Sequence, residues 1–549
     1  MLRAIELENF KALGKSTRIE LAPITLIYGE NSAGKSTILQ ALSLLKQTLE
    51  SRERARDTAL LPKVEGGLVD LGSFRELLFD HDLSKSARIG IAVEPSADPR
   101  EDDLYFRGRS ALRFEPFQMD FTFGQSRATA DVRLMGLGLA FEDNQFPSTE
   151  YKTRRLKSSE LREFGRFFFR PGVSSRAQGR LGYAAECTEI SSHEDHWHAI
   201  FKPWHSSRLE VVEMLRRDRR FIPTAEMRRQ SQRTKPSPKD YDFPPQVDRA
   251  LKFYSSEFTI QQFIERIRNP ALKQLSLIDG FIPRIAATEI ADLPELTLSS
   301  RFRPGSKLKQ HLPVLDFAEK LARAGALVEK TLNAVFPLGP FRRPPERWYM
   351  FPGTSPIDVG YQGDHLPDLL LQSRVTKRAN EWLEKLEIGY QLKPKRIGGA
   401  GSDLFAVRLE DTRRAKRVEV ALSDVGFGIS QILPFIVQCL ASKQRIISIE
   451  QPEVHIHPRL QADLGNLIAE TIKEEYGHQF LIETHSEHLV LRLQRLVREG
   501  KLRPIDLSII FVSRGQDGST VRRLHLDDSG DFLDEWPGGF FPERLNELR

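Results

Sequence analysis

The chain has 549 residues, of which 40% are hydrophobic and 28% are charged, and its formal net charge is +6 at pH 7. These proportions are ordinary for a soluble globular protein, and no segment approaches the roughly 20 consecutive apolar residues of a membrane span, so a membrane protein is excluded. The charged N-terminus lacks the apolar region of a secretory signal, and Cys187 and Cys439 are the only cysteines. We therefore expect a cytoplasmic location and no disulfide framework.

The first informative element is a glycine-rich loop, GENSAGKST, at residues 29–37. It follows the apolar run ITLIYG and precedes the helical pattern ILQALSLL, which is the context that a P-loop requires. Backbone N–H groups and the helix dipole would bind ATP phosphates there, with Lys35 on the β- and γ-phosphates and the Ser36 hydroxyl on Mg²⁺. The residues predicted to bind ATP are Asn31, Ser32, Ala33, Gly34, Lys35, Ser36 and Thr37. The alternative, a glycine-rich turn with a chance lysine, would need all three features to coincide.

The chain divides into three parts by its hydrophobic patterns. Residues 1–150 combine the P-loop with period-2 runs between about 86 and 143, which predict an antiparallel β subdomain. Longer helical patterns such as VLDFAEKLARAGALVEKTLNAVF predict a mainly helical insertion over residues 151–337. A Pro- and Gly-rich crossing follows, and residues 338–549 are then typical of a second α/β half.

Two clusters in the insertion have alternative interpretations. Cys187 and four histidines lie within ECTEISSHEDHWHAIFKPWH, but their spacings fit none of the recurrent zinc patterns, so a packed loop or a partner contact is favoured over a metal site. The basic residues between 208 and 235 follow a helical apolar stripe and are typical of a solvated helix face. The alternative is a phosphate-binding patch that contacts nucleic acid or an acidic protein.

The turn LSDVGFGISQ in the second α/β half precedes an apolar helical run. Ser423, Gly426 and Gly428 form a glycine-flexed helix start, whose N–H groups and dipole can bind an anion. Because the P-loop already takes the β- and γ-phosphates, we expect this second site to bind the nucleotide of a neighbouring subunit. Taken alone, the pattern equally fits an ordinary capped helix.

The apolar run RIISIE ends at Glu450 and is followed by Gln451, Pro452 and Glu453. A carboxylate at the end of such a strand binds Mg²⁺ in P-loop enzymes, so Glu450 and Ser36 are the predicted metal ligands. The next position normally carries a second carboxylate, but the amide of Gln451 cannot accept a proton from water. Hydrolysis is therefore predicted to be slow, with Glu453 as an alternative base one turn further on.

A further apolar strand is followed by His485 in the run FLIETHSEHL. A histidine at this place can sense the γ-phosphate, whereas an isolated histidine more often bonds to backbone at the edge of a core. His485 comes after the run RIISIE, which ends at the predicted metal ligand Glu450, and this order favours the sensing role. Gln451, Glu453 and His485 are thus the candidate catalytic residues.

Four motifs, GENSAGKST, LSDVGFGISQ, IISIEQPEVHIHP and LIETHS, occur in this order. With them the chain resembles the ABC-type ATPase heads of the SMC, Rad50 and RecF kind, and more closely the overcoming-lysogenization-defect group. The resemblance implies an α/β fold, with a mixed sheet and an antiparallel β subdomain, that is split by an insertion. It also implies a head-to-head dimer in which Ser423 and its glycines act on the ATP of the partner subunit.

The finer pattern resembles the PtuA ATPases of Septu-type anti-phage systems and of the retrons that use them. It comprises VDLGSF, GPFRRPPERWY, VGYQGDHLP, IEQPEVHIHP and EWPGGFF. This resemblance implies a homodimer or a higher homo-oligomer of dimers, a separate HNH nuclease resembling PtuB and, in retron versions, a reverse transcriptase with its RNA–DNA hybrid. The short stretch after His485 is too small for the Toprim nuclease domain of the overcoming-lysogenization-defect proteins.

Three functions fit these motifs. The first is an ATP-sensing scaffold of a defence complex that controls a separate nuclease, and Gln451 and the lack of long heptad arms favour it. The second is an SMC- or RecF-like repair ATPase that acts directly on DNA, for which strong DNA-stimulated hydrolysis would be expected. The third is a nucleotide-locked assembly module without turnover.

Overall fold

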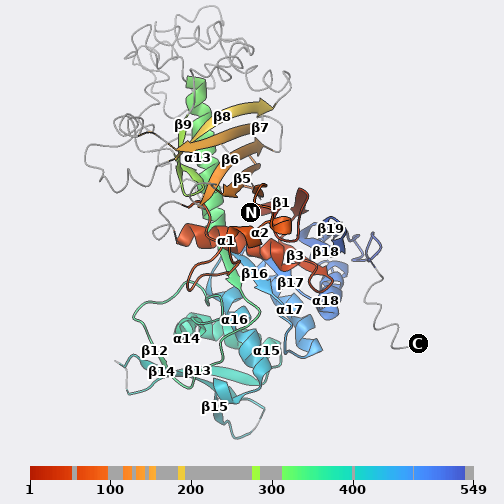
Figure 1. Ribbon diagram of the computed structural model, residues 1–549. Coiled ribbons are helices and arrows are strands. Elements are labelled where there is room, and N and C mark those ends of the chain that lie inside the picture. Colours follow the sequence, from red (N-terminus) through yellow and green to blue (C-terminus); the bar gives the residue numbers. More distant parts are fainter. Residues whose placement is uncertain are drawn as a thin grey trace, which may run out of the picture. The chain divides into compact units, whose positions relative to one another are not determined.

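The structure of the protein is a computed structural model, shown in Figure 1. It describes residues 1–51, 58–96, 115–125, 131–141, 148–155, 157, 183–191, 275–284, 312–398, 402–413, 415–473 and 475–537. The chain divides into two compact units. The first comprises residues 1–2, 51–60 and 86–331, and the second comprises residues 3–50, 61–85 and 332–549. The second unit therefore holds all the candidate phosphate, metal and catalytic residues.

A mixed six-stranded sheet belongs to the second unit, in the order β11-β16-β17-β3-β18-β19 (Figure 1). Neighbouring strands are parallel except for the antiparallel pair β18 and β19. The bounds are β3 Ile24–Gly29, β11 Val335–Leu338, β16 Ile446–Glu450, β17 Gln479–Glu483, β18 Leu507–Gly515 and β19 Gly518–Leu524. Strands buried on both faces need near-continuous apolar runs, as β3, β16 and β17 have. The carboxyl ends of these three strands meet at one edge of the sheet, where ligands bind in such folds.

Helices and two smaller groups of strands complete the second unit. The helices are α1 Ser36–Glu50, α2 Phe74–Leu77, α14 Leu366–Leu370, α15 Ser373–Lys385, α16 Phe427–Ala441, α17 Pro458–Thr471 and α18 Glu487–Arg498, with 3-10 turns η1 Phe79–His81, η5 Leu422–Asp424 and η6 Pro504–Asp506. α1 packs against β11 and β16, and α17 packs against α18. The small strands are β12 Tyr349–Met350, β13 Tyr390–Arg396, β14 Leu404–Asp411 and β15 Glu419–Ala421, with β14 paired to the other three. β1 Leu2–Glu8 pairs antiparallel with β2 Thr17–Glu20.

The first unit contains an antiparallel series of strands in the order β10-β9-β8-β7-β6-β5-β4. Their bounds are β4 Ala87–Val93, β5 Phe117–Gln125, β6 Val132–Phe141, β7 Ser148–Arg155, β8 Tyr183–Ser191, β9 Leu275–Asp279 and β10 Ile282–Arg284, and α13 spans Leu312–Asn333. Alternating apolar residues in β4, β5 and β6 bury one face of this sheet. The predicted α/β class, with a mixed sheet and an antiparallel β subdomain, is confirmed.

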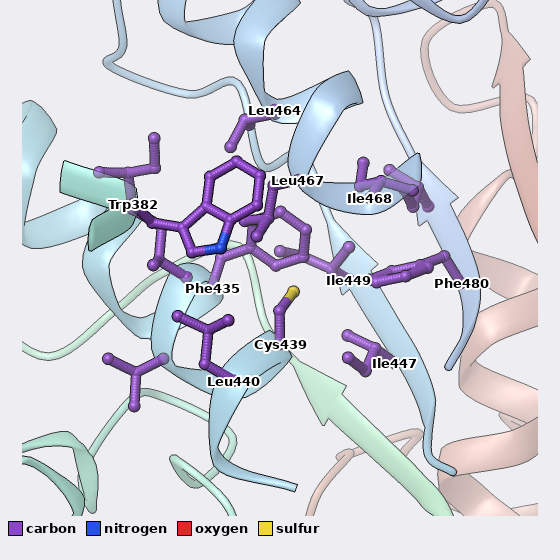
Figure 2. Packing of buried hydrophobic residues seen from close by; sticks show 14 of the residues in the cluster. Trp382, Phe435, Cys439, Leu440, Ile447, Ile449, Leu464, Leu467, Ile468 and Phe480 are labelled. Carbon is purple, nitrogen blue, oxygen red and sulfur yellow. The ribbon is translucent and has the colours of Figure 1, made fainter. Parts of the chain in front are cut away.

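The core of the second unit packs α15, α16 and α17 against β16 and β17 (Figure 2). α16 is apolar around most of its circumference, which is typical of a helix enclosed by other elements. Each fully buried Leu, Ile or Phe side chain contributes about 1.5–3 kcal/mol relative to exposure. The labelled side chains are Trp382, Phe435, Cys439, Leu440, Ile447, Ile449, Leu464, Leu467, Ile468 and Phe480. This packing fixes the strands that end at the candidate site.

One local expectation differs from the structure. The helical pattern expected to continue to Phe336 ends at Asn333, and the following residues form β11 beside β16. The β-branched and aromatic residues of VFPL suit a buried strand, and its pairing with β16 outweighs the helical periodicity. The run GGLVDLGSFRELLF includes the short helix α2, which begins with a capping box at Ser73 and Glu76.

The insertion over residues 151–337 remains a prediction. Within it, the described residues include strands β8, β9 and β10 and helix α13. The basic segment 208–235 lies outside the described residues, as do the histidines of the cysteine and histidine cluster. In the described ranges, no helix is both long and apolar enough to cross a membrane.

His478 is expected to make folding stability depend on pH. Its ring is 3% exposed; Nε2 lies 3.0 Å from the Cys439 carbonyl oxygen, and Nδ1 accepts a hydrogen bond from the Arg445 N–H. Burial lowers the pKa of His478 to about 4. Because the unfolded chain binds the proton more tightly, stability is complete above about pH 6.5 and is lost as the pH falls towards 4. We expect the free energy of unfolding to fall by about 2 kcal/mol between pH 7 and pH 5 from this residue.

Urea unfolding at both pH values measures this effect. The variant His478→Gln should lose most of the difference between them, although it is less stable at pH 7. The control His457→Asn changes an exposed histidine and keeps an N-cap side chain at the start of α17. It should retain the pH dependence of the unchanged protein. Equal pH dependence in His478→Gln and the unchanged protein would contradict the assignment.

Candidate nucleotide-binding site

The P-loop lies between β3 and α1, as predicted. Gly29 has a φ of 144°, and a Cβ atom added there would lie 1.9 Å from the Val512 carbonyl oxygen. Gly34 has a φ of 91°, which only glycine adopts readily, and its Cβ would meet the side chain of Ala12. Both glycines are therefore required by the backbone path.

Hydrogen bonds fix this loop through its carbonyl oxygens. The Lys35 amine donates to the carbonyls of Gly29 at 3.2 Å and Glu30 at 2.8 Å. Arg514 of β18 donates to the Ser32 carbonyl at 3.4 Å. The Ser519 hydroxyl of β19 donates to the carbonyl of Ala33, the next residue of the loop after Ser32, at 2.6 Å. The N–H groups of Ala33 and Thr37 donate to the carbonyls of Glu30 and Gly34, so the other N–H groups of the loop would be the ones to bind phosphates.

A pocket of about 590 Å³ opens at the P-loop. The predicted residues that line it are Ser32, Gly34, Lys35, Ser36 and Thr37, whereas Asn31 and Ala33 are part of the loop but not of its lining. On the opposite side it is lined by η1 and α2 residues together with Lys11 and Gln40, and the Lys11 amine donates to the Gln40 side chain at 2.7 Å. Lys11 supplies a second cation that the sequence interpretation missed. Lys11 lies just after the first strand, and this position is the sequence feature that could have marked it as a candidate.

Glu450 and Glu483 end the neighbouring strands β16 and β17 and are register partners. Burial, followed by repulsion from Glu483, raises the pKa of Glu450 to about 7, although Arg342 and Lys11 oppose this shift. Burial also raises the pKa of Glu483, despite a hydrogen bond from Ser36 and the charge of Lys35. Two desolvated carboxylates therefore lie side by side, and Glu483 contacts the first turn of α1 through Ser36.

This donor set fits Mg²⁺. Oxygen ligands from carboxylates and a hydroxyl are those that Mg²⁺ prefers; here Ser36 bonds to Glu483, and Glu450 is the register partner of Glu483 although it is not part of the pocket lining. Glu483 Oε2 is buried and has no hydrogen-bond partner among the described residues. A bound Mg²⁺ would neutralise phosphate charge and would remove the repulsion between the two carboxylates. Glu483, overlooked beside His485 in the sequence, joins the predicted ligands Ser36 and Glu450.

Gln451 and Glu453 follow the end of β16. Gln451 has a φ of 46°, and its N–H donates to the carbonyl of Glu483 at 2.7 Å. Glu453 accepts hydrogen bonds from the Thr484 hydroxyl and from the His485 N–H, each at 2.7 Å. Each carboxylate oxygen of Glu453 thus accepts one hydrogen bond, and the two bonds hold the carboxylate beside the loop after β17.

His485 lies at the start of the loop after β17 and is exposed. Partial desolvation and the nearby Lys35 cation lower the pKa of its ring. The ring is therefore neutral at pH 7 and near the P-loop lysine, a suitable place to contact a terminal phosphate. The sensing role of His485 stays a prediction.

The turn LSDVGFGISQ, called the signature turn from here on, belongs to the same unit as the P-loop but does not line this pocket. Ser423 is the middle residue of η5 and is exposed, while Gly426 is the N-cap residue of α16. A Cβ atom on Gly428 would lie 2.8 Å from the His455 carbonyl oxygen, so glycine allows α16 to approach the loop after β16. In this pocket the lining contains no residue of the turn. Ser423, Gly426 and Gly428 therefore lie outside the lining of the pocket at their own chain's P-loop.

A family model described as an AAA ATPase domain matches residues 1–94 and 286–490, more than half of the chain. The chain belongs to this AAA ATPase family. Members of such families bind ATP, typically with Mg²⁺, which agrees with the donor set above. No curated protein sequence matches this AAA ATPase at a significant level.

Solved structures similar to this AAA ATPase include SMC head domains. The head from Pyrococcus furiosus, with an extended coiled coil and bound to the C-terminal domain of ScpA, is 13% identical; 100% of this chain and 99% of that chain are covered, with a TM-score of 0.34. The Thermotoga maritima head is 9% identical; 96% of this chain and 99% of that chain are covered, with a TM-score of 0.32. The Pyrococcus yayanosii head is 12% identical; 96% of this chain and 98% of that chain are covered, with a TM-score of 0.35. TM-scores of this size carry no argument, so the assignment rests on the family match and the site.

The AAA ATPase assignment gives Glu483 a testable role. We expect Glu483→Gln to weaken the Mg²⁺ stimulation of ATP binding by roughly ten-fold, because one charged metal ligand is lost. ATP affinity without Mg²⁺ should stay equal or increase, since a negative charge near the phosphates is removed. Titration calorimetry with and without Mg²⁺ separates the two effects. The control Glu475→Gln changes an exposed carboxylate paired with Arg378, and it should leave both affinities unchanged.

Proposed function

We propose that this protein is an ATP-gated head of the PtuA type, which closes as a dimer on two ATP molecules and controls a separate HNH nuclease in anti-phage defence. ATP would lie between the P-loop of one subunit and the signature turn of the other. The order of the four motifs and the finer motifs such as GPFRRPPERWY and IEQPEVHIHP support this assignment. In retron versions a reverse transcriptase and its RNA–DNA hybrid would join the complex.

The observation that carries the proposal is the chemistry at the end of β16. Gln451 stands where a general base is expected, and a glutamine amide cannot take a proton from the attacking water. Glu453, the nearest replacement, already accepts two hydrogen bonds. Such a site would hold ATP for long periods, which suits a switch that reports nucleotide occupancy better than a motor.

The proposal is tested with the protein and the product of a neighbouring gene that encodes an HNH protein. The expected results are a stable complex, ATP-dependent dimerisation of the ATPase and loss of phage protection when either partner is removed. Hydrolysis should be slow and insensitive to DNA. Strong DNA-stimulated hydrolysis by the ATPase alone would instead indicate an SMC- or RecF-like repair enzyme and would overturn the defence assignment.

A further inference from the structure

An arginine outside the P-loop contacts the signature turn directly. Arg347 Nη2 lies 2.8 Å from Asp424 Oδ1, and Arg347 Nη1 lies 3.1 Å from Asp424 Oδ2. This two-point geometry fixes the plane of the carboxylate as well as its position. Asp424 is the last residue of η5, next to Ser423.

The same carboxylate also holds the Ser423 side chain. The Ser423 hydroxyl donates to Asp424 Oδ1 at 3.3 Å, so one oxygen accepts hydrogen bonds from both Ser423 and Arg347. A serine hydroxyl on an exposed turn otherwise rotates among three staggered positions. The chain from Arg347 through Asp424 to Ser423 therefore selects an orientation of the hydroxyl.

The segment that carries Arg347 is itself anchored on its N-terminal side. The N–H groups of Gly339 and Arg343 donate to the carbonyls of Tyr361 at 2.9 Å and Gln362 at 2.8 Å. Between them, Arg342 is 5% exposed and donates to the Pro340 carbonyl at 3.0 Å. Its buried charge interacts with Glu453 and with Glu450, the last residue of β16. The segment is thus tied to Glu450, a predicted metal ligand.

The C-terminal side of the segment is also fixed. The Tyr349 hydroxyl accepts a hydrogen bond from the Glu346 N–H at 2.7 Å. Tyr349 begins β12, which pairs with β14 opposite Phe405, and the two rings lie 5.6 Å apart. Arg347 is therefore held between two anchors and is pre-organised to meet Asp424.

Global stability does not explain this arrangement. The side chains of Arg347 and Asp424 are 66% and 41% exposed, and exposed ion pairs contribute little to folding free energy. The Arg347–Asp424 pair can instead orient the turn that carries Ser423, because a ligand is bound well only when the groups that contact it are held in the correct geometry.

We propose that Arg347 and Asp424 are positioning residues for Ser423: they hold the turn so that the Ser423 hydroxyl can exchange its hydrogen bond to Asp424 for one to the ATP held by a second copy of the chain. The inference rests on the proposed function, because it assumes that ATP closes a dimer across the signature turn. It adds two residues to that interface, one of them 76 positions before Ser423 in the sequence.

The experiment compares ATP affinity at low protein concentration with ATP-driven dimerisation at high concentration. In Arg347→Ala the affinity of the chain's own P-loop for ATP should stay unchanged, while the dimer dissociation constant rises by roughly five-fold. The dimer dissociation constant of Arg347→Lys should lie between those of the unchanged protein and of Arg347→Ala, since lysine keeps the charge but loses the two-point contact. The double variant Arg347→Ala with Ser423→Ala should be no weaker than Ser423→Ala alone, because Arg347 acts only through Ser423.

A matched control comes from the same segment. Arg343 forms surface ion pairs with Glu346 at 3.2 Å and Asp364 at 3.7 Å, and neither belongs to the signature turn. Arg343→Ala should therefore dimerise like the unchanged protein. The inference is overturned if Arg347→Ala also dimerises normally, or if its effect adds fully to that of Ser423→Ala. Failure of the unchanged protein to dimerise with ATP would instead overturn the proposed function, and the inference with it.

Discussion

Replacement of Lys35 by alanine is expected to lower the affinity for ATP by roughly 100-fold or more, since charge-assisted hydrogen bonds to phosphate are lost from a desolvated site. Lys35 is 5% exposed and its pKa is lowered by burial, so its charge is little screened by water. Its amine now bonds to the carbonyls of Gly29 and Glu30, which lie in the loop that would bind the phosphates. A small rotation of the lysine side chain would exchange these carbonyls for phosphate oxygens.

Nucleotide binding and dimerisation should be measured together for Lys35→Ala. Both are expected to fail, because dimer closure depends on bound ATP in the proposed function. Lys15→Ala is the control, since Lys15 is a surface lysine paired with Asp517 at 2.9 Å and is 79% exposed. A thermal unfolding curve will show whether Lys35→Ala is folded, and Lys35→Met, which keeps the length of the side chain, provides a second variant. Unchanged ATP affinity in both folded variants would refute the P-loop assignment.

Replacement of Gln451 by glutamate is expected to increase ATP turnover by roughly 100-fold, the lower end of the contribution of a positioned general base. The substitution keeps the size of the side chain, and the backbone hydrogen bond to Glu483 can remain. The new carboxylate would stand beside Glu450, whose pKa is already raised to about 7 by burial and by Glu483. The new glutamate supplies the second carboxylate that normally follows such a strand, a group that can take the proton from the attacking water.

Steady-state hydrolysis of ATP at saturating Mg²⁺ measures this effect. Gln451→Ala is the matched control, because it removes the amide without supplying a base, and its turnover should not rise. The combined variant Gln451→Glu with Lys35→Ala should be inactive, which excludes a contaminating ATPase. If Gln451→Glu binds ATP normally but its turnover is unchanged, the absent carboxylate does not limit the rate, and Glu453 or a later step such as dimer opening does.

Much of the mixed sheet could be predicted from the sequence. β3, β16 and β17 are short apolar runs with a clear end, and each is followed by residues of distinctive chemistry. Their mutual pairing could not be read from local pattern, because it depends on contacts between segments hundreds of positions apart. β11 was hidden because the helical periodicity of α13 runs into it without a break.

The candidate site was predictable where a motif marked it and not where tertiary contacts complete it. Lys35, Ser36 and Glu450 follow from strand, loop and helix order. Glu483 lies within LIETHS, but only strand register shows that it is the partner of Glu450, and Lys11, which belongs to no motif, reaches the pocket through loop placement. The bond between Arg347 and Asp424 joins residues 77 positions apart, which no local pattern specifies.

The position of β3 has a consequence for synthesis of the protein. β3 pairs with β17 and β18, so the strand that carries the P-loop finds its neighbours only after residue 515 has been made. At 5–20 residues per second, a ribosome needs roughly 25–100 s to travel from β3 to the end of β18. Until β17 and then β18 have been made, the apolar run ITLIYG lacks one or both of its partner strands, and we expect the nascent chain to need a chaperone. The P-loop also lacks its hydrogen bonds from Arg514 and Ser519 during this interval, since these residues lie on β18 and β19.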